Sequence, residues 1–239
     1  MENPSIDLVA QKISGDVNVE NFEPIPNVAE AKYYPITAAQ YRFWVIQQNY
    51  EASATYNVSE AYKLKGDLEA SKLEESFRLL VLPFDNIDFK IENIDLSSSQ
   101  NKDQELAELL NTKKINFRLD EFPLFKVYLI KVDNDEYILW FNTHHIICDG
   151  WSSNLFASEI IKTYNSLVRN ESPNLPDLKI QYKDYADWVN KKNVEESRDF
   201  WIKTLSDDIK RVELPFSGKR KKYQTFNGDK FAFVIDGEN

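Results

Sequence analysis

The sequence predicts a globular protein of the α/β or α+β class. Hydrophobic residues make up 42% and aromatic residues 13% of the 239 residues, enough for a sizeable core in a chain of 28.0 kDa. Segments with apolar residues at helical spacing alternate with short β-rich runs, and two of these runs are joined by a polar turn.

Each element follows from its local pattern. Apolar periodicity predicts helices at residues 38–49, 70–81, 101–111, 152–168, 183–191 and 195–205. Thr37 is the expected N-cap of the first helix. β-rich runs predict strands at residues 61–64, 87–91, 123–132, 137–141 and 231–235. The polar residues 133–136 predict a hairpin turn between the two central strands.

The chain has only two histidines, His144 and His145, and they end the second hairpin strand. Histidine has an unperturbed pKa of about 6.5, so it exchanges a proton near neutral pH. Successive side chains of a strand point to opposite faces, so we expect one histidine to be structural and the other reactive. Gly150 is expected to permit a sharp exit from the strand, and Ser152 to be the N-cap of the next helix. This strand–loop–helix junction predicts a site of proton transfer.

Three other interpretations of this segment remain open. The histidines could be a buried, hydrogen-bonded structural pair. His145 and Asp149 could chelate a metal, although adjacent histidines diverge on a strand and no third histidine is present. Cys148, the single cysteine, could be a nucleophile, although a cysteine in an apolar run is more often an inert core thiol.

The segment His-His-Ile-Ile-Cys-Asp-Gly-Trp-Ser, residues 144–152, resembles the core motif of the condensation domains of nonribosomal peptide synthetases, relatives of chloramphenicol acetyltransferase. Further segments resemble other motifs of that family in the right order, namely residues 34–44, 56–58, 64–68, 117–125, 181–188 and 200–205. The Asp-Gly-Trp-Ser ending is typical of the peptide-bond-forming subtype rather than of epimerase or heterocyclising domains.

This resemblance implies a chloramphenicol acetyltransferase-like lobe, with a mixed sheet packed against helices in a two-layer α+β sandwich. It implies a peptide-bond-forming reaction between aminoacyl or peptidyl groups held as thioesters on 4′-phosphopantetheine. Those arms belong to an upstream donor and a downstream acceptor carrier domain, and the same module has an adenylation domain. No metal and no directly bound cofactor are implied.

The resemblance also implies roles for residues. His145 is expected to face the acceptor amine, either as a base or by holding the amine and the tetrahedral intermediate, while His144 packs away from the channel. Asp149 is expected to orient the loop through an ion pair with an arginine, and Gly150 to let the backbone approach the substrate. Backbone N–H groups at the start of the next helix could stabilise developing negative charge. The expected supporting residues are His144, Trp151, Ser152, Gln40 and Arg42.

The chain departs from the family pattern at residues 83–88. The family has Arg-His-Glu-x-Leu-Arg there, whereas this chain has Pro-Phe-Asp-Asn-Ile-Asp, so both arginines are replaced and acids stand at Asp85 and Asp88. This loss favours a non-catalytic docking or recruitment module as an alternative, while the intact histidine motif argues against it. A CoA-dependent acyltransferase is a further alternative.

The resemblance also divides the chain. Residues 1–13 resemble the last helix of a carrier domain, residues 14–32 are a predicted linker, residues 33–222 an N-terminal lobe, and residues 223–239 the start of a truncated C-terminal lobe. Family members have a second, similar lobe that completes the channel. A fragment is therefore expected to be nearly inactive and to associate with itself through uncovered apolar surface.

Charge and composition limit the partners. The net charge of −10 and the pI of about 4.9 predict no binding to nucleic acid. No apolar run reaches the roughly 20 residues of a membrane span, and neither a secretory pattern nor a second cysteine is present, which together predict a cytoplasmic protein. The basic cluster at residues 219–222 is predicted to be solvated loop charge, with a docking patch for an acidic carrier domain as the alternative.

Overall fold

The computed structural model describes residues 24–48, 54–81, 89–113 and 115–207. They form two compact units. The sheet unit consists of the described residues between Ala38 and Asp177, and the helical unit consists of those in Met1–Thr37 and Leu178–Ser206. The histidine motif belongs to the sheet unit.

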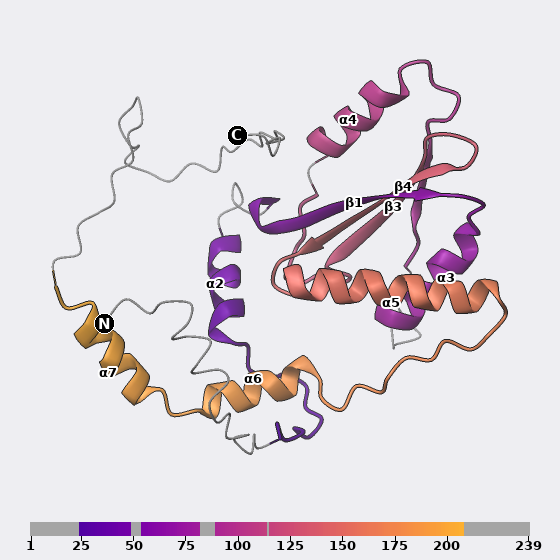
Figure 1. Ribbon diagram of the computed structural model, residues 1–239. Coiled ribbons are helices and arrows are strands. Elements are labelled where there is room, and N and C mark those ends of the chain that lie inside the picture. The colour runs from indigo at the N-terminus through magenta and orange to yellow at the C-terminus, as the bar shows by residue number, and fades with distance from the viewer. Residues whose placement is uncertain (1–23, 49–53, 82–88, 114, 208–239) are drawn as a thin grey trace, which may run out of the picture. The chain divides into compact units, whose positions relative to one another are not determined.

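Four strands form one mixed sheet (Figure 1). Their order across the sheet is β1 (Asn57–Lys65), β4 (Glu136–His144), β3 (Phe125–Lys131) and β2 (Glu92–Asp95). Strand β4 pairs antiparallel with β1 and β3, whereas β2 runs parallel to β3. The central strands β3 and β4 carry the longest runs of buried residues, because side chains pack on both of their faces.

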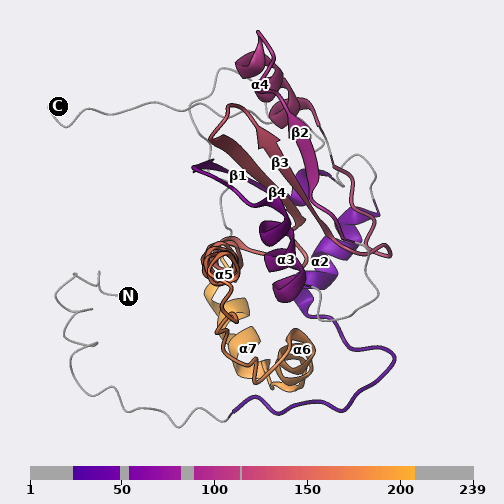
Figure 2. The ribbon, with the colours of Figure 1, turned by 90° about the vertical axis from the view of Figure 1, so that its right-hand side faces the viewer.

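Helices α3 (Ala70–Val81) and α5 (Gly150–Val168) cover one face of the sheet (Figure 2). The core on this face includes Leu73 and Phe77 of α3, Phe125 and Val127 of β3, Phe141 of β4 and Ile160 of α5. Each large apolar side chain contributes about 1.5–3 kcal/mol when it is fully buried. This packing holds the beginning of α5 close to the end of β4.

Helix α4 (Lys102–Thr112) packs on the opposite face (Figure 1). Its leucines contact a second core, which includes Tyr128, Ile130 and Trp140. The Trp140 Nε1–H donates a hydrogen bond of 2.8 Å to Ser59 Oγ on β1. The predicted α/β class with a mixed sheet packed against helices is confirmed, and α4 adds a helix on the second face.

Strands β3 and β4 form the predicted hairpin. Its register pairs Leu129 with Leu139. In the turn, Val132 N–H donates to the Glu136 carbonyl at 2.9 Å. With this register fixed, β4 ends at His144, opposite Asn57 of β1.

Helices were predicted more accurately than strands. The predicted bounds of α3 are correct, and those of the other helices differ by two residues at most: α2 (Ala38–Gln47), α4, α5, α6 (Tyr182–Lys191) and α7 (Glu195–Thr204). Strand β1 is longer than the predicted 61–64, because it pairs with the whole of β4. Within the described part of the chain, every helix is too short or too polar to traverse a lipid bilayer.

The strand predicted at residues 87–91 is wrong where the structure describes it. Phe89 and Ile91 are buried in the core, but neither belongs to a strand, and β2 begins only at Glu92. Their backbone is held by α3 instead, since Ile91 N–H donates to Glu74 Oε2 at 2.9 Å and the Arg78 guanidinium donates to the Phe89 carbonyl. The alternation of apolar residues predicted the burial but not the backbone partner.

The helical unit contains α6, α7 and residues 24–37. Asp184, in the first turn of α6, is 2% exposed and accepts from Gln181 N–H at 2.7 Å and from Val28 N–H at 2.8 Å. These backbone hydrogen bonds lower the pKa of Asp184. The Tyr-Lys-Asp-Tyr-Ala-Asp-Trp segment therefore holds this unit together through its first aspartate.

Several predictions concern residues outside the described ranges. These are the helix within residues 1–13, the first part of the linker, the departure at residues 83–88, the basic cluster at 219–222 and the strand at 231–235.

Candidate active site

The two histidines lie where β4 passes into the loop before α5. His144 is the last residue of β4, and its N–H donates to the Leu124 carbonyl at 3.0 Å. The N–H of His145 donates to the Tyr56 carbonyl at 2.8 Å. The backbone of both residues is thus anchored to the neighbouring chain segments on either side.

His144 is buried and neutral. Its side chain is 1% exposed, and its Nδ1 accepts a hydrogen bond of 3.1 Å from Ile146 N–H. Its Nε2 lies 3.3 Å from Gln47 Oε1, so the Nε2–H tautomer satisfies both contacts. Burial, and then the charge of His145, lowers the pKa of His144. A neutral imidazole with both nitrogens occupied cannot exchange protons with a substrate.

His145 has a different environment. Its side chain is partly exposed, and no described residue forms a hydrogen bond with its imidazole. One face of the ring stacks on Phe43 of α2, with ring centroids 5.0 Å apart and an interplanar angle of 22°. Phe43 itself is only 9% exposed, which makes it a firm support. The ring nitrogens of His145 are therefore available to an incoming group.

Asp149 caps helix α5. Its backbone is extended, and its Oδ1 accepts from Ser152 N–H at 2.8 Å and from Ser152 Oγ–H at 2.7 Å. These two hydrogen bonds lower the pKa of Asp149 more than any other contact does. None of the ion pairs among the described residues includes Asp149, so the expected ion pair with an arginine is not found in that part of the chain. The carboxylate is exposed and shapes the loop as an N-cap.

Three further expectations about this junction are corrected. Ser152 is not the N-cap, because α5 already begins at Gly150 and Ser152 lies in its first turn. Gly150 does not have a positive φ, and a Cβ there would meet nothing within 4 Å, so no sharp exit requires glycine. The N–H groups of Trp151 and Ser152 hydrogen-bond the Asp149 carboxylate, so they cannot stabilise developing negative charge in this state.

Substitutions at Asp149 should show whether this residue stabilises the fold as an N-cap or through an ion pair. Asp149→Ala is expected to cost about 0.5–2 kcal/mol of stability, whereas Asp149→Asn should stay close to wild type, because asparagine is an equally good N-cap. Thermal or chemical unfolding of the two variants measures the difference. A large loss of stability in Asp149→Asn would show that the negative charge, and not the cap, stabilises the fold.

Cys148 is a poor nucleophile here. Its thiol is partly buried, its Sγ lies 3.3 Å from Ser153 Oγ, and burial is the main cause that raises its pKa. A thiol with a raised pKa stays protonated near neutral pH. No cluster of three or more histidine, cysteine or carboxylate side chains able to hold a metal occurs among the described residues.

The supporting residues differ in their contacts. Gln40 Nε2 donates to the Ile146 carbonyl at 3.4 Å, and thus touches the loop that carries His145. The guanidinium of Arg42 is exposed and lies 5.4 Å from the centre of the Phe43 ring. Trp151 is 84% exposed, so it does not support the site by packing within the described residues.

Two functional residues were missed by sequence reasoning. Phe43 stacks on His145, and Gln47 contacts His144, both from α2. Gln40, Phe43 and Gln47 are spaced by three and four residues, which places them on one face of a helix. The sequence shows this spacing, but no pattern among neighbouring residues indicated that this face of the helix would contact a loop about one hundred residues later.

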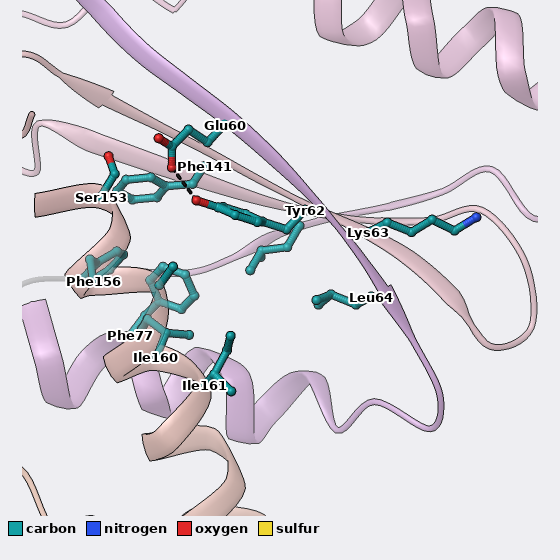
Figure 3. A pocket seen from close by; sticks show the side chains of 12 residues that line it. Glu60, Tyr62, Lys63, Leu64, Phe77, Phe141, Ser153, Phe156, Ile160 and Ile161 are labelled. Atoms are coloured by element: carbon teal, nitrogen blue, oxygen red, sulfur yellow. Dashed lines mark hydrogen bonds between the residues drawn. The ribbon is translucent and has the colours of Figure 1, made fainter. Parts of the chain in front are cut away.

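An apolar cavity of about 230 Å³ lies between β1, α3 and α5 (Figure 3). Figure 3 shows Phe77, Phe156 and Ile160 around it, while the Tyr62 hydroxyl donates to the Glu60 carboxylate near Ser153. Burial and that hydrogen bond raise the pKa of Tyr62 to about 12. Glu60 lies three residues, or about 10 Å, along β1 from Asn57, which pairs with His144, and Ser153 at this end of the cavity lies 3.3 Å from Cys148 of the histidine motif.

Comparisons with known proteins agree with these observations. The family model "Condensation domain" matches residues 80–239. Bacitracin synthase 2 of Bacillus licheniformis is 30% identical over 232 residues, which are 90% of this chain and 9% of that protein. Tyrocidine synthase 3 of Brevibacillus parabrevis is 30% identical over 248 residues, 95% of this chain and 4% of that protein.

Solved structures share the fold. The X-domain from teicoplanin biosynthesis matches with a TM-score of 0.71 and 19% identity, over 83% of this chain and 49% of that chain. The starter condensation domain of rhizomide synthetase matches with a TM-score of 0.62 and 21% identity, over 73% of this chain and 48% of that chain. The chain thus spans about half the length of these domains and less than a tenth of the two synthetases. By the match of the family model and the identity to the synthetases, the chain belongs to the condensation domain family.

Proposed function

We propose that the chain contributes the histidine-bearing lobe of a condensation domain that forms peptide bonds in nonribosomal peptide synthesis. The α-amine of the acceptor attacks the thioester carbonyl of the donor, a C–N bond forms, and the C–S bond breaks. The proton lost by the amine ends on the departing thiol. The observation that carries this proposal is the contrast between His145, whose ring is available, and His144, which is buried and neutral.

His145 has the properties needed to act on the amine. Its imidazole can accept the proton as the new bond forms, or hold the amine and the tetrahedral intermediate in place. The Phe43 ring fixes its plane from one side. Gly150 lies exposed with open space around its Cα, which would let a substrate backbone approach closely.

The proposed substrates are aminoacyl or peptidyl thioesters on the 4′-phosphopantetheine arms of a donor and an acceptor carrier domain, in a module that also contains an adenylation domain. Membership of the family supports these partners. A reducing cytoplasm is the proposed compartment, since it suits the free thiol of Cys148.

We further propose that the reaction needs the half of the domain that these 239 residues do not span. Three apolar residues in and just after the motif expose more than half of their surface and are spaced four residues apart, namely Ile147, Trp151 and Leu155. A stripe of this kind supports burial against another lobe, or self-association of the isolated chain.

The cavity beside α5 is proposed to hold an apolar group of the donor. Most of its lining side chains are apolar, with Glu60, Lys63 and Ser153 as polar exceptions, and its end near Ser153 is close enough to the motif for an extended acyl or peptidyl group to reach. A starter condensation domain of rhizomide synthetase has been solved in complex with C8-CoA, which supports an acyl chain as one such group.

Filling the cavity should weaken the use of donors with long apolar groups. Ala157 lies on α5 at the cavity wall. Ala157→Trp is expected to raise KM for such a donor about tenfold, because the donor would lose roughly 60 Å² of apolar contact with the protein. Ala107→Trp on the exposed side of α4 is the matched control. KM is measured for an octanoyl donor and for an acetyl donor. If Ala157→Trp has the same KM for the octanoyl donor as Ala107→Trp does, this use of the cavity is contradicted.

A docking or recruitment module is the alternative that one comparison favours. The X-domain of teicoplanin biosynthesis, which shares this fold, has been solved in complex with OxyB. A module of this kind would bind a partner without using His145.

The test uses these residues in a complete condensation domain, with the 239-residue chain alone as a second sample. Both are incubated with loaded donor and acceptor carriers, or with an acyl-CoA and a soluble amine, and the products are identified by mass spectrometry. Dipeptide on the acceptor carrier, formed by the complete domain and not by the 239-residue chain, supports the proposal. Product only from acyl-CoA indicates a free-standing acyltransferase, and no product with either pair indicates a docking module.

A further inference from the structure

Gln47 of α2 links two segments that are distant in sequence. Its side-chain Nε2 donates to the Phe117 carbonyl at 2.7 Å, and its Oε1 lies 3.3 Å from His144 Nε2. The side chain is partly buried, so water competes less for these groups than on an open surface. Both the nitrogen and the oxygen of the Gln47 amide therefore have a hydrogen-bond partner.

The chemistry of these contacts fixes the direction of every hydrogen bond. The Phe117 carbonyl can only accept, so the Gln47 amide nitrogen must face it and the amide oxygen must face His144. That oxygen can only accept, so His144 must carry its proton on Nε2. Nδ1 of His144 is then unprotonated, as its contact with Ile146 N–H at 3.1 Å requires.

The end of this chain of hydrogen bonds is the peptide next to His145. The N–H of Ile146 is held by His144, and its carbonyl accepts from Gln40 Nε2 at 3.4 Å. The ring of His145 rests on Phe43, which lies between the two glutamines on α2. One face of α2 therefore holds the loop on both sides of the His145 side chain.

From this arrangement we infer that Gln47 is a positioning residue for the reaction at His145. By accepting from His144 Nε2, it selects the His144 tautomer that can hold the Ile146 peptide, and so fixes where the His145 ring stands. Gln47 does not touch the substrate in this mechanism. The predicted effect on the rate rests on the proposed condensation function, whereas the predicted tautomer of His144 does not depend on that function.

Loss of this selection should displace His145. In Gln47→Met, where the new side chain has similar length but no hydrogen-bonding groups, His144 has no acceptor at Nε2, and the tautomer holding Ile146 is favoured by the Ile146 N–H contact alone. A misplacement of about 1 Å at a reacting group costs about 10²-fold in rate. We therefore expect kcat to fall about 10- to 100-fold, with little change in KM for the carriers.

The experiment has a spectroscopic and a kinetic part. Because His144 and His145 are the only histidines, ¹⁵N-histidine labelling of the 239-residue chain gives two imidazole spin systems, from which the tautomer of each ring is read directly. Rates are measured with the same substitutions in the complete domain and loaded carriers. Gln48→Met is the matched control, since the exposed side chain of Gln48, just after α2, donates to the Trp44 carbonyl at 3.1 Å and contacts neither histidine among the described residues.

We expect a pure Nε2–H tautomer of His144 in the wild type and in Gln48→Met. In Gln47→Met we expect a mixed tautomer, a shifted His145 ring and the lower kcat. An Nδ1–H tautomer in the wild type overturns the inference, and so does a Gln47→Met variant that changes only the tautomer or only the rate. If the wild-type domain does not catalyse condensation, the proposed function fails, while the spectra still decide whether Gln47 fixes His144 and the His145 ring.

Discussion

Replacing His145 with alanine is expected to lower the condensation rate of the complete domain about 10²- to 10⁴-fold, the usual cost of losing a general acid–base group. The melting temperature should stay near that of the wild type, because the side chain is partly exposed and no described residue forms a hydrogen bond with its ring. Single-turnover transfer between loaded carriers measures the chemical step without the delay of product release.

The control for this result is a variant that keeps the shape of the ring. His145→Phe can still stack on Phe43 but cannot accept a proton, so its rate should be as low as that of His145→Ala. A rate near wild type in either variant would show that His145 is not the reacting group. Normal binding of the loaded acceptor carrier in both variants would place the loss in the chemistry and not in docking.

Replacing His144 with alanine is expected to act mainly on stability. The variant leaves Ile146 N–H and Gln47 Oε1 without their partner, and an unsatisfied buried group costs about 1–3 kcal/mol. For a protein of this size, each kcal/mol corresponds to a fall of about 2–4 °C in Tm. Differential scanning calorimetry measures the loss. A melting temperature equal to that of the wild type would mean that the His144 contacts contribute nothing to the fold.

The same variant should change how stability depends on pH. Burial lowers the pKa of His144 in the folded state, so below the unfolded pKa of about 6.5 the unfolded chain binds more protons than the folded one. The stabilising effect is therefore fully present above that pKa and is lost progressively as the pH falls from it to the lowered pKa of the folded state. His144→Ala should lack this part of the pH dependence, and the difference between the two unfolding curves from pH 7.5 to 5.5 isolates it.

Much of the fold could be predicted from the sequence, because helices and hairpins are short-range patterns. Apolar spacing gave the bounds of α3 correctly, and the polar turn located the β3–β4 hairpin that ends at His144. The two-residue period of a strand was enough to predict that His144 and His145 would have different environments. Order and spacing of the motifs were enough to indicate the family.

The details of the site followed the sequence less closely. Asp149 was expected to pair with an arginine, yet it caps α5, because the helix begins two residues earlier than predicted and its free N–H groups are the nearest donors. The strand predicted at residues 87–91 failed for a similar reason, since side chains of α3 took the hydrogen bonds that a strand partner would have supplied. In both cases the residue type indicated the local role, a capping carboxylate or a buried apolar side chain, but not the group with which the residue would form its hydrogen bond.

What the sequence determined by itself is the helices of the described residues, the central hairpin, the position of the two histidines and the family to which the chain belongs. Only the tertiary structure decided that α2 would meet the histidine loop, so that Phe43 supports His145 and Gln47 selects the tautomer of His144. The physical reason is distance along the chain. Periodicity and capping depend on residues within one or two turns, whereas Gln47 and His144 are 97 positions apart and meet only in the folded chain, where Phe43 of α2 packs against the rings of both histidines.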